Sequence, residues 1–300
     1  MTTLIAIDWG TTSFRAYLFD KNEDIIDSIS SPAGIMQGDD IVFEDVLYAQ
    51  IGSWLNNYPD IPVLASGMIT SRQGWVETPY LSCPASLNDL SKNLSERLTR
   101  TGHKIYFVPG VCQKTPIANI MRGEETQMAG LNCGKPLTAI LPGTHSKWIR
   151  MENEKINHFS TFMTGEIFAA LTQHTILARL LTNEEDFEGF VLGVQQGFHS
   201  QKDSGGILSK LFGARAMPLL DLMPRESIKD YISGLLLGTE VQEAVKTGFG
   251  VESKPIICGA TELAERYRKA LEICGIQTEL GKPDLAASGL FRIAITADLI

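Results

Sequence analysis

The chain has 300 residues, enough for two domains of ordinary size, of which 44% are hydrophobic and 20% charged. This composition excludes a disordered, collagen-like or disulfide-stabilised protein, and no apolar run reaches the roughly 18 residues of a membrane span. The net charge of −9 disfavours a nucleic-acid partner or a polybasic contact with a membrane.

Cysteine and histidine spacing gives no sign of a metal site. None of the five cysteines (Cys83, Cys112, Cys133, Cys258 and Cys274) stands in a Cys-x-x-Cys pair, which favours reduced thiols in a cytoplasmic protein. The five histidines lie far apart, so a zinc site is not expected. No basic segment precedes the first apolar stretch, which argues against a signal peptide.

The first part of the chain predicts strands interrupted by one helix. Apolar runs predict strands over residues 4–8, 14–19, 24–30, 62–66 and 104–109. Between them, apolar residues at three- and four-residue spacing from Val46 to Tyr58 predict an amphipathic helix that Pro59 ends.

The later part alternates helices and strands. A long helical pattern covers residues 227–246, and a short strand over 255–258 leads through Gly259 into a helix over 261–271. Strands mixed with helices over this length indicate an α/β protein.

Residues 6–15 are echoed 133 positions later by residues 139–148, with Ala, Ile, Gly, Thr and Ser in register and no gap. Both copies continue into a strand, a polar turn and another strand. This pattern predicts a duplicated domain with matching sheet order, divided into residues 1–115 and 116–300.

Each copy places a Gly-Thr-x-Ser turn between two strands. The first turn is Gly10-Thr11-Thr12-Ser13, and the second begins at Gly143-Thr144-His145. Successive backbone N–H groups with neighbouring hydroxyls form an anion cradle, so two such turns facing each other would hold a polyphosphate from both sides. Plain β-hairpins with polar turns are the alternative. Asp8 favours the cradle, because a carboxylate directly before it suits hydrated Mg²⁺ beside phosphate oxygens.

Several motifs resemble one family over nearly the whole chain. The Asp8-x-Gly10-Thr11-Thr12 turn and its echo are similar to the phosphate segments of the actin-like ATPase superfamily, which includes hexokinases. More specific segments resemble the 2-dehydro-3-deoxygalactonokinases: residues 7–12, 66–68, 74–75, 79–81, 121–127, 142–148, 164–166 and 233–236. The segments 121–127 and 142–148 are long and unusual.

The resemblance implies two ribonuclease H-like domains with mixed sheets flanked by helices and an ATP cleft between them. It also implies Mg²⁺ and ATP-dependent phosphorylation of 2-dehydro-3-deoxy-D-galactonate at its terminal C6 hydroxyl, in galactonate breakdown. A third turn, Gly259-Ala260-Thr261, stands at the family's adenosine segment, where a Gly-Ser pair is common. This departure puts the adenosine contacts in doubt.

A sugar kinase needs a carboxylate base near the attacking hydroxyl. Glu124, after Gly123, matches the family's position for this base, and Glu125 is the second candidate. The alternative is that both acids only favour a helix N-terminus.

The substrate contacts are expected from Arg122 and from an earlier loop. Arg122 suits the substrate carboxylate, although a surface ion pair is equally plausible, and Arg15 and Arg72 are weaker candidates. The loop Ser66-Gly67-Met68 offers groups for sugar hydroxyls. Trp75 is either an apolar wall for the sugar or a core residue.

Further candidates lie around the second turn. His145 and Lys147 are placed to meet phosphates, with a solvated Lys147 equally plausible. Thr164 reads as the N-cap of a helix more readily than as a ligand contact. The helix that carries Glu262, Glu265, Arg266 and Arg268 reads as a solvated face.

The alternatives are a kinase for the gluconate epimer or another small sugar, a non-catalytic nucleotide-binding regulator, and a filament or chaperone protein. A repressor carries an added basic segment, and actin-type proteins are longer. The preferred epimer and the oligomeric state, a homodimer included, stay open.

Overall fold

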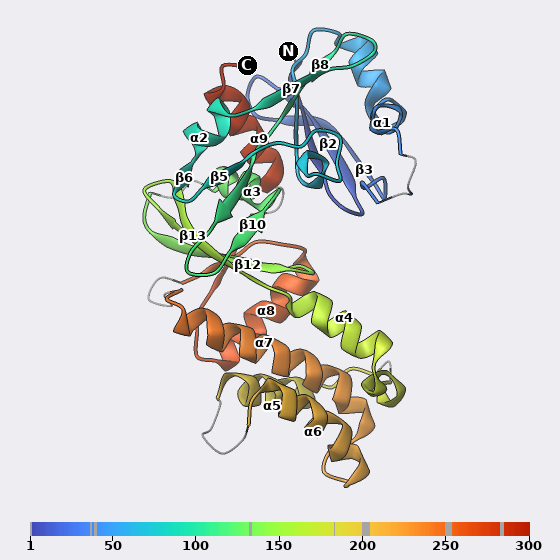
Figure 1. Cartoon of the computed structure of the whole chain (residues 1–300), viewed down its shortest axis with the longest axis vertical. Helices are drawn as coiled ribbons and strands as arrows, with labels where there is room; N and C mark the ends of the chain where they lie inside the picture. Colours follow the sequence, from blue (N-terminus) through green and yellow to red (C-terminus); the bar gives the residue numbers. More distant parts are fainter. Residues whose placement is uncertain are drawn as a thin grey trace. The chain divides into compact units, whose positions relative to one another are not determined.

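The computed structural model describes residues 2–36, 38, 41–131, 134–182, 184–199, 205–249, 254–282 and 285–300. The chain forms two compact units (Figure 1). Unit 1 comprises Met1–Lys135, Met151–His158 and Asp284–Ile300, and unit 2 comprises Pro136–Arg150 and Phe159–Pro283. These ranges differ from the expected 1–115 and 116–300, because the helix that follows residue 123 packs on the C-terminal helix within unit 1.

Unit 1 is built on a six-stranded sheet with the order β3-β2-β1-β4-β8-β7. Its members are β1 (Thr2–Trp9), β2 (Phe14–Asp20), β3 (Ile25–Ser31), β4 (Val63–Ser66), β7 (Ser95–Leu98) and β8 (Lys104–Phe107). The first three strands form an antiparallel meander, and β4 and β8 continue the sheet in parallel from β1. The predicted strands of the first part of the chain are therefore confirmed.

Helices cover both faces of this sheet. Ile5 and Ile7 of β1 are fully buried in one cluster with Leu47 and Ile51 of α1 (Phe43–Asn57). Successive strand residues point to opposite faces, so Leu4 and Ala6, also fully buried, face the other side, where α9 (Leu285–Thr296) contacts β1.

The rest of unit 1 consists of short elements. A second sheet has the order β10-β9-β5, and the chain also forms a 3-10 turn, a two-residue strand and two short helices. These elements are η1 (Met68–Thr70), β5 (Tyr80–Ser82), β6 (Ala85–Ser86), α2 (Leu87–Lys92), β9 (Gly110–Gln113), β10 (Asn119–Met121) and α3 (Glu124–Gly130).

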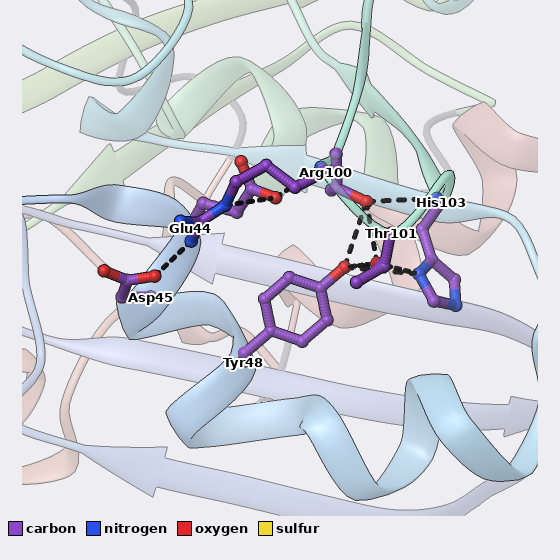
Figure 2. A network of polar contacts seen from close by, with 7 residues as sticks. Glu44, Asp45, Tyr48, Arg100, Thr101 and His103 are labelled. Carbon is purple, nitrogen blue, oxygen red and sulfur yellow. Dashed lines mark hydrogen bonds and ion pairs between the residues drawn. The ribbon is translucent and has the colours of Figure 1, made fainter.

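The turn between β7 and β8 is fastened to α1 by polar side chains (Figure 2). The Tyr48 hydroxyl donates to Thr99 Oγ1 at 3.0 Å, and the Arg100 guanidinium pairs with Glu44 and Asp45. Exposed ion pairs contribute little stability. The network fixes the edge of the sheet, and none of its residues is a candidate site residue.

Unit 2 repeats the sheet order of unit 1. Its strands are β11 (Leu137–Leu141), β12 (Ser146–Glu152), β13 (Lys155–Phe162), β14 (Ile256–Ile257) and β15 (Glu279–Leu280). Their order β13-β12-β11-β14-β15 matches β3-β2-β1-β4-β8, with β14 parallel to both β11 and β15. The predicted duplication is therefore confirmed in the sheet order. The first residues of β13, Lys155 and Ile156, belong to unit 1, where they pair with β6.

Helices make up most of unit 2. They are α4 (Thr164–His174), η2 (Ile176–Leu180), α5 (Phe187–Phe198), α6 (Ile207–Leu219), η3 (Arg225–Ser227), α7 (Ile228–Lys246) and α8 (Thr261–Ile273). The helices α7 and α8 confirm the predicted patterns over 227–246 and 261–271. The long α7 is mostly buried and packs against α5, beside it in Figure 1. Of the helices in the described ranges, none is long and apolar enough to cross a membrane.

Candidate functional site

The first Gly-Thr turn is held in place by backbone hydrogen bonds from the segment that follows β3. Gly10 N–H donates to Ser13 O at 2.8 Å and closes the turn. Ile35 N–H donates to Gly10 O at 3.0 Å, and Met36 N–H donates to Thr11 O at 3.1 Å. The turn thus has a fixed backbone, while the Thr12 side chain is exposed.

Asp8 lies at the end of β1, with 18% of its side chain exposed. Burial raises the pKa of its carboxyl group, the Arg15 guanidinium at 3.4 Å lowers it, and the negative charge of Glu124 raises it. Two carboxylates near each other favour a cation between or beside them.

The loop after β4 approaches Asp8 closely. Ser66 is the register partner of Asp8 in the parallel pair of β1 and β4. Gly67 has φ +93°, and a Cβ there would lie 2.8 Å from Trp9 O and 3.3 Å from Asp8 Oδ1. A Cβ on Gly123 would lie 3.4 Å from Gly67 Cα. Unit 1 therefore brings together three predicted segments: the first turn, the Ser66 loop and the start of α3.

The two acids at the start of α3 differ in exposure. Glu124 is partly exposed, and its Oε2 accepts from Arg122 N–H at 3.2 Å. Glu125 is 1% exposed, and burial together with the Glu124 charge raises its pKa to about 8. Both Glu125 oxygens accept from Gly123 N–H, at 2.8 and 2.9 Å. Glu124 is thus the acid that a substrate reaches more easily.

Arg122 is engaged within unit 1. Its Nη1 donates to the hydroxyls of Thr70 and Thr78, at 2.9 and 2.5 Å, and its Nη2 donates to Thr78 O at 2.6 Å. The guanidinium also lies 4.0 Å from the centre of the Tyr80 ring. The alternative of a surface ion pair for Arg122 is therefore wrong, because the side chain is buried and these three bonds go to Thr70 and Thr78. The Nε–H and the second N–H of Nη2 remain on one side of the guanidinium, the pair of donors that can grip a carboxylate.

Three buried polar atoms around this loop have no hydrogen-bond partner in the part of the chain that is described. They are Ser66 Oγ, Ser71 Oγ and Arg122 Nε. Buried polar groups are normally satisfied by protein, water or ligand. Their grouping beside Gly67 indicates a place where a hydroxylated ligand or water completes the structure.

Two other expected substrate contacts lie differently. Trp75 packs edge-on against Phe107, with ring centres 5.8 Å apart, and the Arg97 guanidinium lies over the Trp75 ring, 5.5 Å from its centre. This is the core alternative for Trp75 rather than an open apolar wall. Met68 is half-buried in η1, and Arg72 is exposed.

The second Gly-Thr turn, in unit 2, is backed by the start of α4. A Cβ on Gly165 would lie 2.6 Å from Gly143 O, and Glu166 N–H donates to Thr144 O at 3.0 Å. His145 Nε2 lies 2.5 Å from Glu166 Oε2. Close packing of α4 therefore fixes the backbone of this turn.

The expected cap at Thr164 and the solvated alternative for Lys147 are wrong. The N-cap of α4 is Met163, and Thr164 is the first helical residue, with its side chain hydrogen-bonded to Glu240. Lys147 is not solvated: it is 5% exposed, and its Nζ donates to His145 O at 3.2 Å.

A cavity of about 430 Å³ opens beside the second turn within unit 2. Its lining combines the turn and the start of α4 with residues of α7 and α8. The polar residues among them are Thr144, Thr164, Glu184, Glu185, Lys229, Asp230, Ser233, Glu262, Arg266 and Tyr267. The size and mixed polarity suit a small organic ligand.

The third expected turn, residues 259–261, lies next to the cavity and does not line it. Gly259 packs against Pro142, Ala260 is the N-cap of α8, and α8 begins at Thr261. The next helical turn, Glu262 to Tyr267, lines the cavity instead. Sequence reasoning missed these cavity residues because their spacing matches an ordinary amphipathic helix.

Arg266 corrects the expectation of a solvated face on α8. Its Nε donates to Ser233 Oγ at 2.8 Å and its Nη2 to Asp230 Oδ1 at 2.5 Å. Its guanidinium lies 4.5 Å from the centre of the Phe190 ring. Arg266 is therefore a fixed, planar cation in the cavity wall.

The donors present fit a Mg²⁺ ion held through water and phosphate. Among the described residues there is no group of three His, Cys, Asp or Glu side chains that could hold a metal ion. Mg²⁺ commonly keeps several waters and takes one or two carboxylates plus substrate phosphates. Asp8, beside the Glu124 charge and the Gly10 turn, matches that pattern.

Comparisons with known proteins identify the family of the chain. A family model described as 2-keto-3-deoxy-galactonokinase matches residues 8–293. The chain is 34% identical over 294 residues to the 2-dehydro-3-deoxygalactonokinase of Escherichia coli (strain K12), covering 97% of each chain.

Solved structures show the same fold. A crystal structure from Sinorhizobium meliloti, of a protein assigned as a 2-dehydro-3-deoxygalactonokinase, matches with a TM-score of 0.83 and 29% identity, over 97% of this chain and 98% of that one. The activator of 2-hydroxyisocaproyl-CoA dehydratase from Clostridium difficile matches with a TM-score of 0.52 and 13% identity, over 99% and 96%. The expected α/β class of the actin-like ATPases is confirmed.

Proposed function

The chain belongs to the 2-keto-3-deoxy-galactonokinase family, and we propose that it transfers phosphate from ATP to the C6 hydroxyl of 2-dehydro-3-deoxy-D-galactonate. The observation that carries the proposal is the close approach of Gly67 to both Asp8 and Gly123 in unit 1, together with the charge of Glu124 that acts on Asp8. A metal-binding carboxylate, a backbone that allows close approach and a second carboxylate are what phosphoryl transfer to a hydroxyl requires.

Glu124 acts as the general base. It is partly exposed at the first position of α3, while the buried Glu125 fixes the helix start through Gly123. Glu124 accepts the proton of the C6 hydroxyl as the new O–P bond forms, and the bond to the leaving ADP oxygen breaks.

Asp8 is the residue that would hold Mg²⁺. When Mg²⁺ is bound, it neutralises charge that develops on the phosphate oxygens. Asp8 binds it through water, and Gly10, Thr11, Thr12 and Ser13 offer backbone N–H groups and hydroxyls to phosphate oxygens. Burial is the main cause of the raised pKa of Asp8, and the nearby charge of Glu124 adds to it against the effect of Arg15.

The sugar acid binds at the loop after β4. Ser66 and Ser71, whose hydroxyls are buried without partners among the described residues, donate to sugar hydroxyls. Gly67 lets this loop lie close to Asp8, and the neighbouring Met68 completes the loop. Arg122 positions this loop through Thr70 and Thr78, and its Nε–H with the second N–H of Nη2 is available for the substrate carboxylate.

Unit 2 binds the nucleotide. Gly143, Thr144 and His145 meet the phosphates, and the cavity between α7 and α8 takes the nucleoside. The junction of Gly259, Ala260 and Thr261 supports the start of α8. A cytoplasmic location and a role in galactonate breakdown complete the proposal.

An ADP-release assay tests this function. The enzyme is given ATP and either 2-dehydro-3-deoxy-D-galactonate, the gluconate epimer or plain hexoses, with and without Mg²⁺. We expect Mg²⁺-dependent turnover that is fastest with the galactonate-derived acid. Faster turnover of the gluconate epimer would change the substrate, and activity on glucose with neither keto-deoxy acid would overturn the proposal.

A further inference from the structure

A buried carboxylate lies at the centre of unit 2, outside the groups assigned to the reaction. Glu240, on α7, is 2% exposed. Its Oε1 accepts from Ser146 Oγ and from Trp148 Nε1, both at 2.8 Å. Its Oε2 accepts from the Tyr267 hydroxyl at 3.0 Å, and the Thr164 side chain also hydrogen-bonds to it. One carboxylate therefore receives four side-chain donors.

These donors come from three different elements. Ser146 begins β12 and directly follows the second Gly-Thr turn, and Trp148 lies two residues further on. Thr164 is the first residue of α4, whose Gly165 packs against that turn. Tyr267 belongs to α8 and lines the cavity. Glu240 thus joins β12, α4 and α8 to α7. Residues of α4, α7 and α8 line the proposed nucleotide site, and β12 begins directly after the turn that lines it.

Burying a carboxylate costs free energy, so its presence here calls for a reason. A buried charge loses the hydration that it has in water, and a well-packed apolar residue would avoid that loss. In return, a fully satisfied polar network accepts one arrangement of its donors, since each hydrogen bond depends on direction and distance. Apolar contacts are not directional, so by themselves they would let the helices and the strand shift relative to one another.

We infer that Glu240 is a positioning residue for the nucleotide. It fixes the turn that contacts the phosphates in one geometry relative to α4 and α8, which form the nucleoside cavity. A nucleotide then meets both parts of its site without reorganising unit 2. The inference rests on the proposed function, because it assumes that this cavity takes the nucleotide.

The test is Glu240→Gln. Glutamine keeps the size and one acceptor oxygen for Ser146 and Trp148, but it places an amide donor opposite the Tyr267 hydroxyl. We expect the Kd for ADP with Mg²⁺, measured by isothermal titration calorimetry, to rise at least fivefold. The KM for ATP should rise in parallel, while the KM for the sugar acid stays within twofold of the wild-type value.

Tyr231→Phe is the matched control. Tyr231 lies on the same helix, is 1% exposed and donates to Gln196 Oε1 at 2.7 Å, away from the four-donor network. Loss of the Tyr231 hydroxyl removes a partly buried hydrogen bond on the same helix without touching Glu240, so the Kd for ADP should stay within twofold. Equal weakening in both variants would show general destabilisation and overturn the inference, as would an unchanged Kd in Glu240→Gln.

A second variant decides the matter if Glu240→Gln does not fold. Ser146→Ala removes one donor from a fully buried position, and we expect about a threefold rise in the Kd for ADP. A wild-type Kd in that variant would overturn the inference. If the wild-type protein itself binds neither ADP nor ATP, the proposed function fails rather than the role of Glu240.

Discussion

Gly123 N–H donates to both carboxylate oxygens of Glu125, at 2.8 and 2.9 Å, although Glu125 is only two residues further along the chain. This contact folds the Glu125 side chain back over the start of α3 and buries it. Glu124, the residue between them, is left partly exposed beside Asp8. Two adjacent acids thus take different roles because their surroundings differ.

Glu124→Gln should lower kcat by about 10²–10⁴-fold, which is the usual cost of losing a general base. Glutamine keeps the size and still positions the substrate, so KM should change little, the pattern of an interaction made mainly in the transition state. Steady-state kinetics with varied sugar acid measures both constants. A loss of less than tenfold would place the base elsewhere.

Glu125→Gln should instead change the pH dependence of stability. Burial raises the folded-state pKa of Glu125 from 4.5 to about 8, so the folded chain keeps a proton that the unfolded chain releases. Stability contributed by this group therefore falls as pH rises between these values, by up to about 1.4 kcal/mol per pH unit. Glutamine does not titrate and still accepts from Gly123.

Thermal melts of both proteins at several pH values between 5 and 8 measure this effect. The wild-type Tm should fall more steeply with pH than the Tm of Glu125→Gln, and kcat should fall less in this variant than in Glu124→Gln. Parallel slopes would contradict the protonated state of Glu125. If Glu125→Gln were the inactive variant, the roles of the two acids would be exchanged.

Asp8→Asn should abolish most turnover and leave the fold intact. The carboxylate is assigned to hydrated Mg²⁺, and its loss removes charge stabilisation on the order of several kcal/mol from the transition state. The substitution also removes a charge close to Glu124, so the Tm should not fall. Activity against Mg²⁺ concentration and a thermal melt test the two parts. Early melting would make Asp8 a structural residue.

The sequence predicted the elements and the unit 1 site better than the cavity in unit 2. Strand alternation and the internal echo gave the repeated sheet order, because those patterns depend on local periodicity. The meeting of Gly67 with Gly123 depends on backbone approach between distant segments, which only the motif resemblance indicated. Arg266 carried no local signal, since it lies on a helix whose spacing fits ordinary amphipathic packing. Glu240 carried none either, since it is a single acid within the long helical pattern over residues 227–246.

Arg122 shows another limit of sequence reasoning. An arginine beside two acids suggests a surface ion pair or a ligand contact, but its partners Thr70 and Thr78 lie 52 and 44 residues away. Hydrogen bonds over such separations depend on the tertiary fold. The same applies to Lys147, which is buried because the tertiary fold covers both faces of β12 at this point.

Gly289→Ala should destabilise unit 1 and disturb the start of α3. A Cβ at residue 289 would lie 1.8 Å from Thr126 O, so α9 and α3 must move apart. Overpacking of this kind costs roughly 1–3 kcal/mol or more. Because α3 carries Glu124 at its first position, kcat should fall as well as the Tm.

Gly213→Ala is the matched control, since Gly213 lies inside the helix α6 of unit 2 and a Cβ there meets nothing within 4 Å. Alanine favours a helix over glycine by up to about 1 kcal/mol, so this variant should melt at the same or a higher temperature with unchanged kcat. Melting curves and kcat for the two variants, measured in parallel, test the packing of α3 on α9. A Gly289→Ala protein that melts and turns over like the wild type would show that this contact does not position Glu124.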